Sequence, residues 1–295
     1  MRSEIVRSIG RRPVPITPLR PAIQQTSGEW LSRQAGEGLD FRTYRSYNLG
    51  DDPRSVHLAT TIRTGEQTVI ERVALRDLCL LVVLDCSPSM AVRRKADMLL
   101  AAALIMIYSG VRMEMRVGAV IAEEDGYLSL GMGSGQRFAS RLLARVEDVC
   151  RSAGAGNESL PALRRVPLKR LLPPGGILMY MSDFLDEGGE VRAFPAFAGA
   201  VRRYDFIPVV IQDEFECSFP ELHDDTLMEF VDPETGVLQD VWLSPEERAR
   251  LRSLHEERFR RLEHMFHAHG ARPIHIGEPG IGHVYTAMNR YFLAR

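Results

Sequence analysis

The hydrophobic positions along the chain form two kinds of stretch: short continuous runs and longer segments with helical spacing. The runs at residues 78–84 (LCLLVVL) and 176–181 (GILMYM) are typical of parallel strands buried on both faces. A segment with helical spacing follows each run, at about 92–112 and at about 189–204. Strands that alternate with helices predict an α/β fold with a doubly wound, mainly parallel sheet.

Most of the chain after residue 112 keeps this alternation. Ser244, Pro245 and Glu247 form a capping box with proline at the first helical position, which marks the start of a long helix. The other expected elements are strands at 115–122, 127–130, 206–211 and 272–276, a helix at 138–150, and a final helix at the C-terminal end.

Two segments fall outside the alternation and are expected to be β embellishments. Residues 27–76 contain strand pieces without a long helix, and residues 212–243 contain short strands around a hairpin-turn composition, DPETG. We therefore expect a β-rich leader at 27–76 and an α/β domain at 77–295 that carries a β-hairpin insertion at 212–243.

The first 26 residues differ in composition from the rest of the chain. They contain five arginines and four prolines. Because proline removes a backbone donor and blocks helix, residues 1–26 are expected to form an extended arm. A solvated tail is the favoured interpretation of this arm, and a docking arm is the alternative.

Composition and charge narrow the classes of function. The formal net charge of −2 gives no overall electrostatic footprint for nucleic acid. The four cysteines are scattered without a C-x-x-C pair, which favours thiols in a reducing compartment over disulfides. The N-terminal residues show no signal-peptide core, and no apolar run reaches the roughly 20 residues of a membrane span. We expect a cytoplasmic protein without a membrane span.

The residues that suggest chemistry follow the first buried strand directly. Asp85, Ser87 and Ser89 occupy alternate positions of the loop DCSPS, and Asp183 follows the later strand. Ligand sites in open α/β sheets lie at the carboxyl ends of strands, so the fold can bring these side chains to one edge. Carboxylates and hydroxyls are the hard oxygen donors that suit Mg²⁺.

Taken alone, the D-x-S-x-S pattern is weak. Serine and aspartate are ordinary helix caps, and Ser89 can simply cap the helix that follows. Three further observations favour a metal site: the hydrophobic strand before the loop, the long helix after it, and the second strand that ends in Ser182 and Asp183.

These segments resemble the metal-ion-dependent adhesion site of von Willebrand A domains. LLVVLDCSPSM before a helix, and ILMYMSDF about a hundred residues later, carry the likeness. The resemblance implies an Mg²⁺ or Mn²⁺ site formed by Asp85, Ser87, Ser89 and Asp183. The family's middle loop normally supplies a threonine, and Asn157 stands at that place here, with Ser159 as a nearby substitute.

A narrower resemblance, to the bacterial domain-of-unknown-function 58 family, covers most of the chain. Members join a β-rich leader to a von Willebrand A domain and are encoded beside MoxR-type AAA+ ATPases. The resemblance implies a non-enzymatic adaptor or co-chaperone that acts with such an ATPase on a client enzyme. One departure is His57-Leu58, where the family usually has Asp-Trp. The matching residues include Gly36, Asp40, Phe41, Arg45, Tyr47, Gly50, Asp51, Asp52, Arg54 and Arg63.

Two rival interpretations remain. A metal-assisted hydrolase would need a general base or a second metal, and only serines flank the candidate carboxylates in the sequence. A metal-free scaffold with the same fold is the other alternative, because Asn157 replaces the threonine.

His264, His267 and His269 cluster near a helix end, where solvated histidines are more common than metal ligands.

Overall fold

The computed structural model describes residues 12–18, 39–47, 56–74, 78–123, 126–152, 166–185, 198–217, 226–232 and 236–295. The chain divides into two compact units. The smaller unit is residues 24–78, and the larger unit combines residues 1–23 with residues 79–295.

The smaller unit contains one antiparallel strand pair and one short helix. Strands β1 (Leu39–Ser46) and β2 (Thr68–Ala74) pair with a bulge between Phe41 and Thr43. Helix α2 (Leu58–Thr64) begins after His57, whose ring nitrogen accepts a hydrogen bond from the Thr60 backbone N–H at 3.3 Å. The residue that departs from the family pattern, His57, therefore caps this helix.

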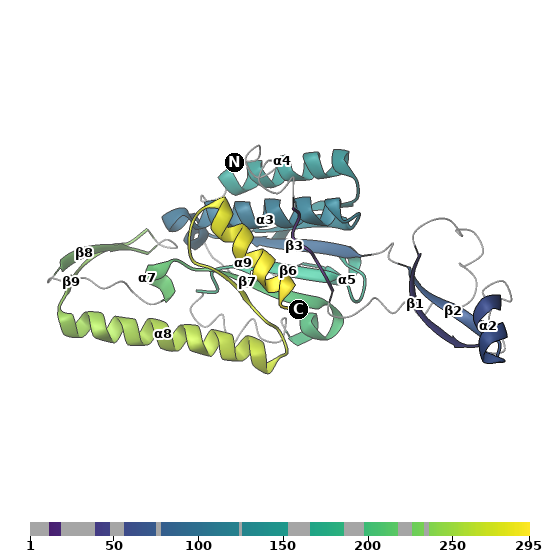
Figure 1. Cartoon of the computed structure of the whole chain (residues 1–295). Helices are drawn as coiled ribbons and strands as arrows, with labels where there is room; N and C mark the ends of the chain where they lie inside the picture. The colour runs from purple at the N-terminus through teal and green to yellow at the C-terminus, as the bar shows by residue number, and fades with distance from the viewer. Residues whose placement is uncertain are drawn as a thin grey trace. The chain divides into compact units, whose positions relative to one another are not determined.

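The larger unit is built on a six-stranded sheet in the order β10-β7-β6-β3-β4-β5, of which Figure 1 labels β7, β6 and β3. All neighbours in it are parallel except β4 and β5. This confirms the predicted α/β fold with a mainly parallel sheet. The strands are β3 (Cys79–Asp85), β4 (Arg116–Glu123), β5 (Gly126–Gly133), β6 (Ile177–Ser182), β7 (Asp205–Ile211) and β10 (Ile274–Ile276).

Helices cover both faces of this sheet. Figure 1 shows α3 (Lys95–Arg112) and α4 (Gln136–Ser152) on one side and α8 (Pro245–Ala268) on the other. Side chains from β3 alternate accordingly: Leu81 and Val83 belong to the core cluster that contains Phe266 of α8. Helix α9 (Ile281–Leu293) contacts α3 and β10, and the predicted capping box of Ser244 starts α8.

The long apolar helix begins later than the sequence pattern indicated. A 3₁₀ segment, η3 (Pro88–Arg94), precedes α3, and the chain kinks within this segment at Val92 and Arg93. Arg93 and Arg94 adopt left-handed φ angles of 51° and 65°. Hydrophobic spacing alone does not register such a kink, because it changes the backbone direction and not the order of apolar residues. The helix expected at 189–204 is described only from residue 198 onward.

The N-terminal segment is not a solvated tail where the structure describes it. Val14 and Ile16 are fully buried. The Val14 backbone N–H donates to Ser109 Oγ at 3.0 Å, and the Tyr285 hydroxyl donates to the Arg12 carbonyl at 2.9 Å. Residues 12–18 therefore pack against α3 and α9, and the favoured interpretation of this arm is corrected for this stretch.

A hairpin lies between β7 and α8, within the segment 212–243. It consists of the short helix α7 (Glu214–Cys217) and the antiparallel strands β8 (Thr226–Val231) and β9 (Leu238–Leu243). In the described parts of the chain, no helix is both long enough and apolar enough to cross a membrane.

Candidate functional site

The predicted site residues of the two strand ends lie at adjacent positions of the sheet. β3 ends at Asp85 and β6 ends at Ser182, and the two strands pair in parallel up to Leu84 and Met181. From β3 the chain moves to β4 on one side of the sheet and later returns to β6 on the other. The carboxyl ends of β3 and β6 therefore flank the topological switch point, where α/β sheets bind ligands.

Hydrogen bonds tie the two strand ends together. The Ser182 hydroxyl donates to Asp85 Oδ2 at 2.6 Å, and the Ser87 backbone N–H donates to Asp85 Oδ1 at 3.0 Å. The hydroxyl oxygens of Ser87 and Ser89 are 3.0 Å apart. The structure thus gathers the three predicted side chains of the DCSPS loop beside the end of β6.

The position of Asp183 depends on the backbone turn at the next residue, Phe184. Phe184 adopts a left-handed backbone with φ of 55°, which is uncommon for a residue that is not glycine. Its ring packs edge-on against Tyr180 and Phe266, with ring centroids 5.3 Å and 5.2 Å away. Such a conformation persists only where the surrounding packing enforces it, so the turn after β6 is held in one geometry.

Asp85 carries a charge in an unfavourable environment. Asp85 is 8% exposed, and this burial, together with the charge of Asp183, raises its pKa from 3.8 to about 6. The hydrogen bonds from Ser182 and Ser87 act in the opposite direction. A buried carboxylate of this kind is stabilised by binding either a proton or a cation.

Lys95, which the sequence analysis did not single out, is the principal cation of the site. Its side chain is 1% exposed at the start of α3. Its ammonium donates to Asp183 Oδ2 at 2.7 Å and to Glu216 Oε1. Burial lowers the pKa of Lys95, but the charges of Asp183 and Glu216 outweigh burial and raise it. The sequence feature that could have identified Lys95 as a site residue is its place at the start of a largely apolar helix.

Glu216 brings the hairpin insertion to the site. It lies on α7, and burial raises its pKa while the charge of Lys95 opposes the rise. The guanidinium of Arg93 lies 3.6 Å from the ring centroid of Phe215 and 3.7 Å from Asp213 Oδ2. A third carboxylate therefore stands at this edge, although it is bound to Lys95 and not to Asp85.

Some predicted site residues lie outside the described part of the chain. Asn157 and Ser159 of the middle loop are among them, as are residues 50–54 of the leader. Within the described part, no group of three or more His, Cys, Asp or Glu side chains is placed to hold a metal. Apart from Glu216, which is bound to Lys95, the predicted ligands are two carboxylates and hydroxyls, so any cation there would depend on the serines and on water.

The loop also brings two cysteines together. Cys86, between Asp85 and Ser87, is half-buried, and its Sγ lies 3.9 Å from Sγ of the buried Cys150 at the end of α4. The hydrogen bond from Cys86 lowers the pKa of the Cys150 thiol, and burial opposes this effect. All four cysteines lie within the described residues, and none is in a disulfide.

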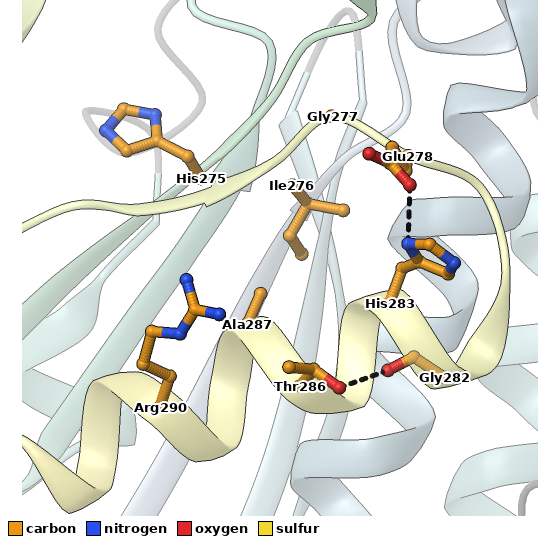
Figure 2. Close-up of a pocket in the computed structure, with 9 residues that line it drawn as sticks. All are labelled: His275, Ile276, Gly277, Glu278, Gly282, His283, Thr286, Ala287 and Arg290. Carbon is orange, nitrogen blue, oxygen red and sulfur yellow. Dashed lines mark hydrogen bonds and ion pairs between the residues drawn. The ribbon is translucent and has the colours of Figure 1, made fainter.

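A separate cavity of about 560 Å³ lies between β10 and α9 (Figure 2). Two of its lining residues are in contact, with Nδ1 of His283 2.5 Å from Oε2 of Glu278, while the His275 ring points away from them. β7 separates β10 from β6, so this cavity is distinct from the predicted edge. None of the predicted site residues lines it.

The fold and the residues at the carboxyl ends of β3 and β6 define a mixed α/β protein. Its acidic, hydroxyl-rich site lies at the topological switch point of the sheet. The chain belongs to the family described as "Protein of unknown function DUF58", whose model matches residues 43–263. Uncharacterized proteins of Mycobacterium tuberculosis and Mycobacterium bovis are 27% identical over 226 residues, which is 74% of this chain and 68% of theirs.

Matches among solved structures are more distant. The open conformation of the pilus adhesin SpaC from Lactobacillus rhamnosus GG is 10% identical over 75% of this chain, with a TM-score of 0.41. The PilB minor pilin from Streptococcus sanguinis is 9% identical over 78% of this chain, with a TM-score of 0.40. The chain spans only 30% of SpaC and 64% of PilB.

Proposed function

We propose that this protein is a von Willebrand A-type binding module that contacts a partner protein through a divalent cation at the β3–β6 edge. The observation that carries the proposal is the meeting of Asp85, Ser87 and Ser89 with the end of β6, at the switch point of a parallel sheet. Ligands of open α/β sheets bind at this place.

The donor set fits Mg²⁺ or Mn²⁺. Asp85, Ser87, Ser89 and Asp183 offer only hard oxygen donors, and the raised pKa of Asp85 reports a buried charge that a cation would relieve. When bound, the cation offers a coordination position to an external carboxylate. Asn157 is the proposed donor of the middle loop, by its place in the family pattern.

Lys95 has a structural role in this proposal. It neutralises Asp183 on one side and Glu216 on the other, and so holds α7 of the insertion against the end of β6. The remaining oxygen of Asp183, Oδ1, accepts the Leu185 backbone N–H at 3.2 Å. Asp85 and the two serines are then the side chains that dominate cation binding.

The partner that we propose, from the family resemblance, is a MoxR-type AAA+ ATPase, with a client enzyme whose maturation or metal insertion the pair assists. The insertion offers a second contact surface. Leu227 pairs with Trp242 and Val231 with Leu238, so all four project from one face of the hairpin, and each is more than half exposed. The charged pair Glu229–Asp240 lies between these two apolar pairs on the same face, and exposed apolar side chains among polar ones are typical of protein-binding sites.

Calorimetry with Mg²⁺ and Mn²⁺ tests the cation directly. We expect the wild-type chain to bind either ion and Asp85→Ala to lose that binding. Glu229→Ala, on the exposed hairpin, is the matched control and should bind as the wild type does. Equal affinities of wild type and Asp85→Ala would exclude the assignment.

Association with the ATPase is a second measurement. Loss of one charge-assisted contact from a desolvated interface costs about 2–5 kcal/mol, so chelation with EDTA should weaken the complex at least about tenfold. A Ser87→Ala, Ser89→Ala double variant with an intact fold should weaken it similarly. Recovery of the ATPase to the same extent with and without metal would place the contact elsewhere.

One observation favours a second candidate, a metal-free scaffold. The Lys95 ammonium already supplies a positive charge to Asp183, as a metal would. In that case Lys95, and no metal ion, neutralises Glu216 and Asp183, and the site serves to dock the insertion. Metal analysis of protein purified without chelators separates the two: a stoichiometric divalent cation supports the binding module, and its absence after saturation with Mg²⁺ and Mn²⁺ supports the scaffold.

A further inference from the structure

We propose that Cys86 and Cys150 form a redox couple, and that their disulfide reversibly disables the cation site. The second half of this inference rests on the proposed function, while the first half stands on the positions of the two thiols alone. Their sulfur atoms are 3.9 Å apart although 64 residues separate them in sequence. A disulfide measures about 2.05 Å, so the sulfur atoms must approach by roughly 2 Å, which side-chain rotation with a small backbone shift can supply.

The two thiols differ in access. Cys86 is half-buried in the loop, whereas Cys150 is 6% exposed on α4. An oxidant in solution therefore reaches Cys86 first, and Cys150 lies behind it as the resolving thiol. A solvent-accessible cysteine next to a resolving cysteine is common in thiol-based redox sensors, and Cys86 is the more accessible of this pair. A cytoplasmic setting, as the sequence analysis expects, would keep the pair reduced until an oxidant appears.

The oxidant that the inference requires is a hydroperoxide. The Cys86 thiolate attacks one oxygen of hydrogen peroxide, the O–O bond breaks, and hydroxide leaves, so that Cys86 becomes a sulfenic acid. The Cys150 sulfur then attacks the Cys86 sulfur, the S–O bond breaks, and water leaves with the proton of the thiol. In total, two thiols lose two electrons and two protons, and one peroxide is reduced to two water molecules.

The disulfide acts on the site because of where Cys86 lies. Asp85 and Ser87 flank it, and the Ser87 N–H is hydrogen-bonded to the Asp85 carboxylate across it. Drawing the Cys86 sulfur toward α4 turns the peptide groups that orient both side chains. Displacing the supports of metal ligands typically weakens metal binding about 10–100-fold, so we expect at least about tenfold weaker cation binding in the oxidised chain.

The first experiment tests the covalent step without any metal. The full chain is reduced, treated with EDTA, exposed to hydrogen peroxide, and analysed by thiol titration and peptide mapping. We expect two of the four thiols to disappear, a Cys86–Cys150 cross-linked peptide to appear, and dithiothreitol to restore both. Oxidation of Cys86 beyond the sulfenic acid without a cross-link, or a cross-link to Cys217 instead, would overturn the inference.

Single variants assign the roles of the two thiols. In Cys150→Ser we expect no cross-link, and a sulfenic acid at Cys86 that dimedone traps. Cys217 is the other half-buried thiol, and Cys217→Ser should form the Cys86–Cys150 link at the wild-type rate. Serine is close to cysteine in size, and circular dichroism is used to check that each variant is folded. Dimedone labelling at Cys150 and not at Cys86 would reverse the proposed order and overturn it.

The second experiment measures the consequence for the site. Mn²⁺ binding is compared by calorimetry between the reduced and the oxidised chain, with Cys150→Ser treated in the same way as the control. Weaker binding only in the cross-linked chain supports the switch, and equal affinities overturn it. If the reduced chain binds no cation at all, the proposed function fails while the thiol couple is still judged by the first experiment.

Discussion

Removing the charge of Asp85 should stabilise the metal-free protein. Burial and the charge of Asp183 raise the Asp85 pKa from 3.8 to about 6. One pKa unit corresponds to about 1.4 kcal/mol, so ionised Asp85 lowers the free energy of unfolding by about 3 kcal/mol well above pH 6. Asp85→Asn removes this charge but gives Ser182 a weaker acceptor, so we expect a net gain of about 1–3 kcal/mol at pH 7.5.

The pH dependence of this effect has a definite sign. Because the folded-state pKa of Asp85 lies above the unfolded value, the folded chain binds more protons between about pH 4 and pH 6. The contribution of Asp85 to stability is therefore fully present below pH 4 and is lost as the pH rises through 6. The difference between Asp85→Asn and the wild type should be near zero at pH 4 and reach its full size at pH 7.5.

Urea unfolding in EDTA, followed by circular dichroism at several pH values, measures this difference. A second buried aspartate supplies the control. Asp205 accepts two hydrogen bonds of 2.7 Å from Arg295, and both side chains are less than 5% exposed. Asp205→Asn should be destabilising by about 3–5 kcal/mol, because it leaves a buried guanidinium without its counter-charge. If Asp85→Asn destabilises the protein as Asp205→Asn does, the electrostatic reasoning at the site is wrong.

Four further outcomes are expected. Asn157→Thr should tighten Mg²⁺ binding in calorimetry, because it restores the hydroxyl donor of the wider family; unchanged affinity would show that this loop is not a ligand. Lys95→Gln should lower the free energy of unfolding in EDTA by about 3–5 kcal/mol, because two carboxylates lose their counter-charge, and should tighten Mg²⁺ binding. Ile16→Ala should cost about 2–5 kcal/mol in urea unfolding, whereas a solvated segment would show no change. We expect no phosphatase or peptidase turnover; reproducible turnover abolished by Asp183→Ala would favour the hydrolase.

The sheet could be predicted because each buried strand is recognisable from a short, continuous stretch of sequence. Buried parallel strands are continuous apolar runs, and β3 and β6 are recognisable from seven and six residues of sequence. The meeting of Asp85 with the end of β6 also followed, since a parallel sheet brings strand ends to a common edge. The DCSPS loop and the Ser182–Asp183 segment lie together because β3 and β6 are neighbours in the sheet.

The parts that escaped prediction depend on long-range contacts. Lys95 gives no signal as an ion-pair partner, because its acceptors lie 88 and 121 residues further along the chain. The left-handed arginines before α3 likewise have no glycine or proline to mark them. In the arm, prolines and arginines suggested solvation, but the two apolar side chains between the prolines, Val14 and Ile16, determine the packing.

The burial of residues 12–18 has a consequence for biosynthesis. One hydrogen-bond donor to this stretch, Tyr285, is synthesised 273 residues after its acceptor, Arg12. The smaller unit, residues 24–78, is complete long before that donor exists. Until α9 has been synthesised, residues 12–18 lack one of the contacts that hold them, so Val14 and Ile16 are apolar side chains that a chaperone can bind in the nascent chain.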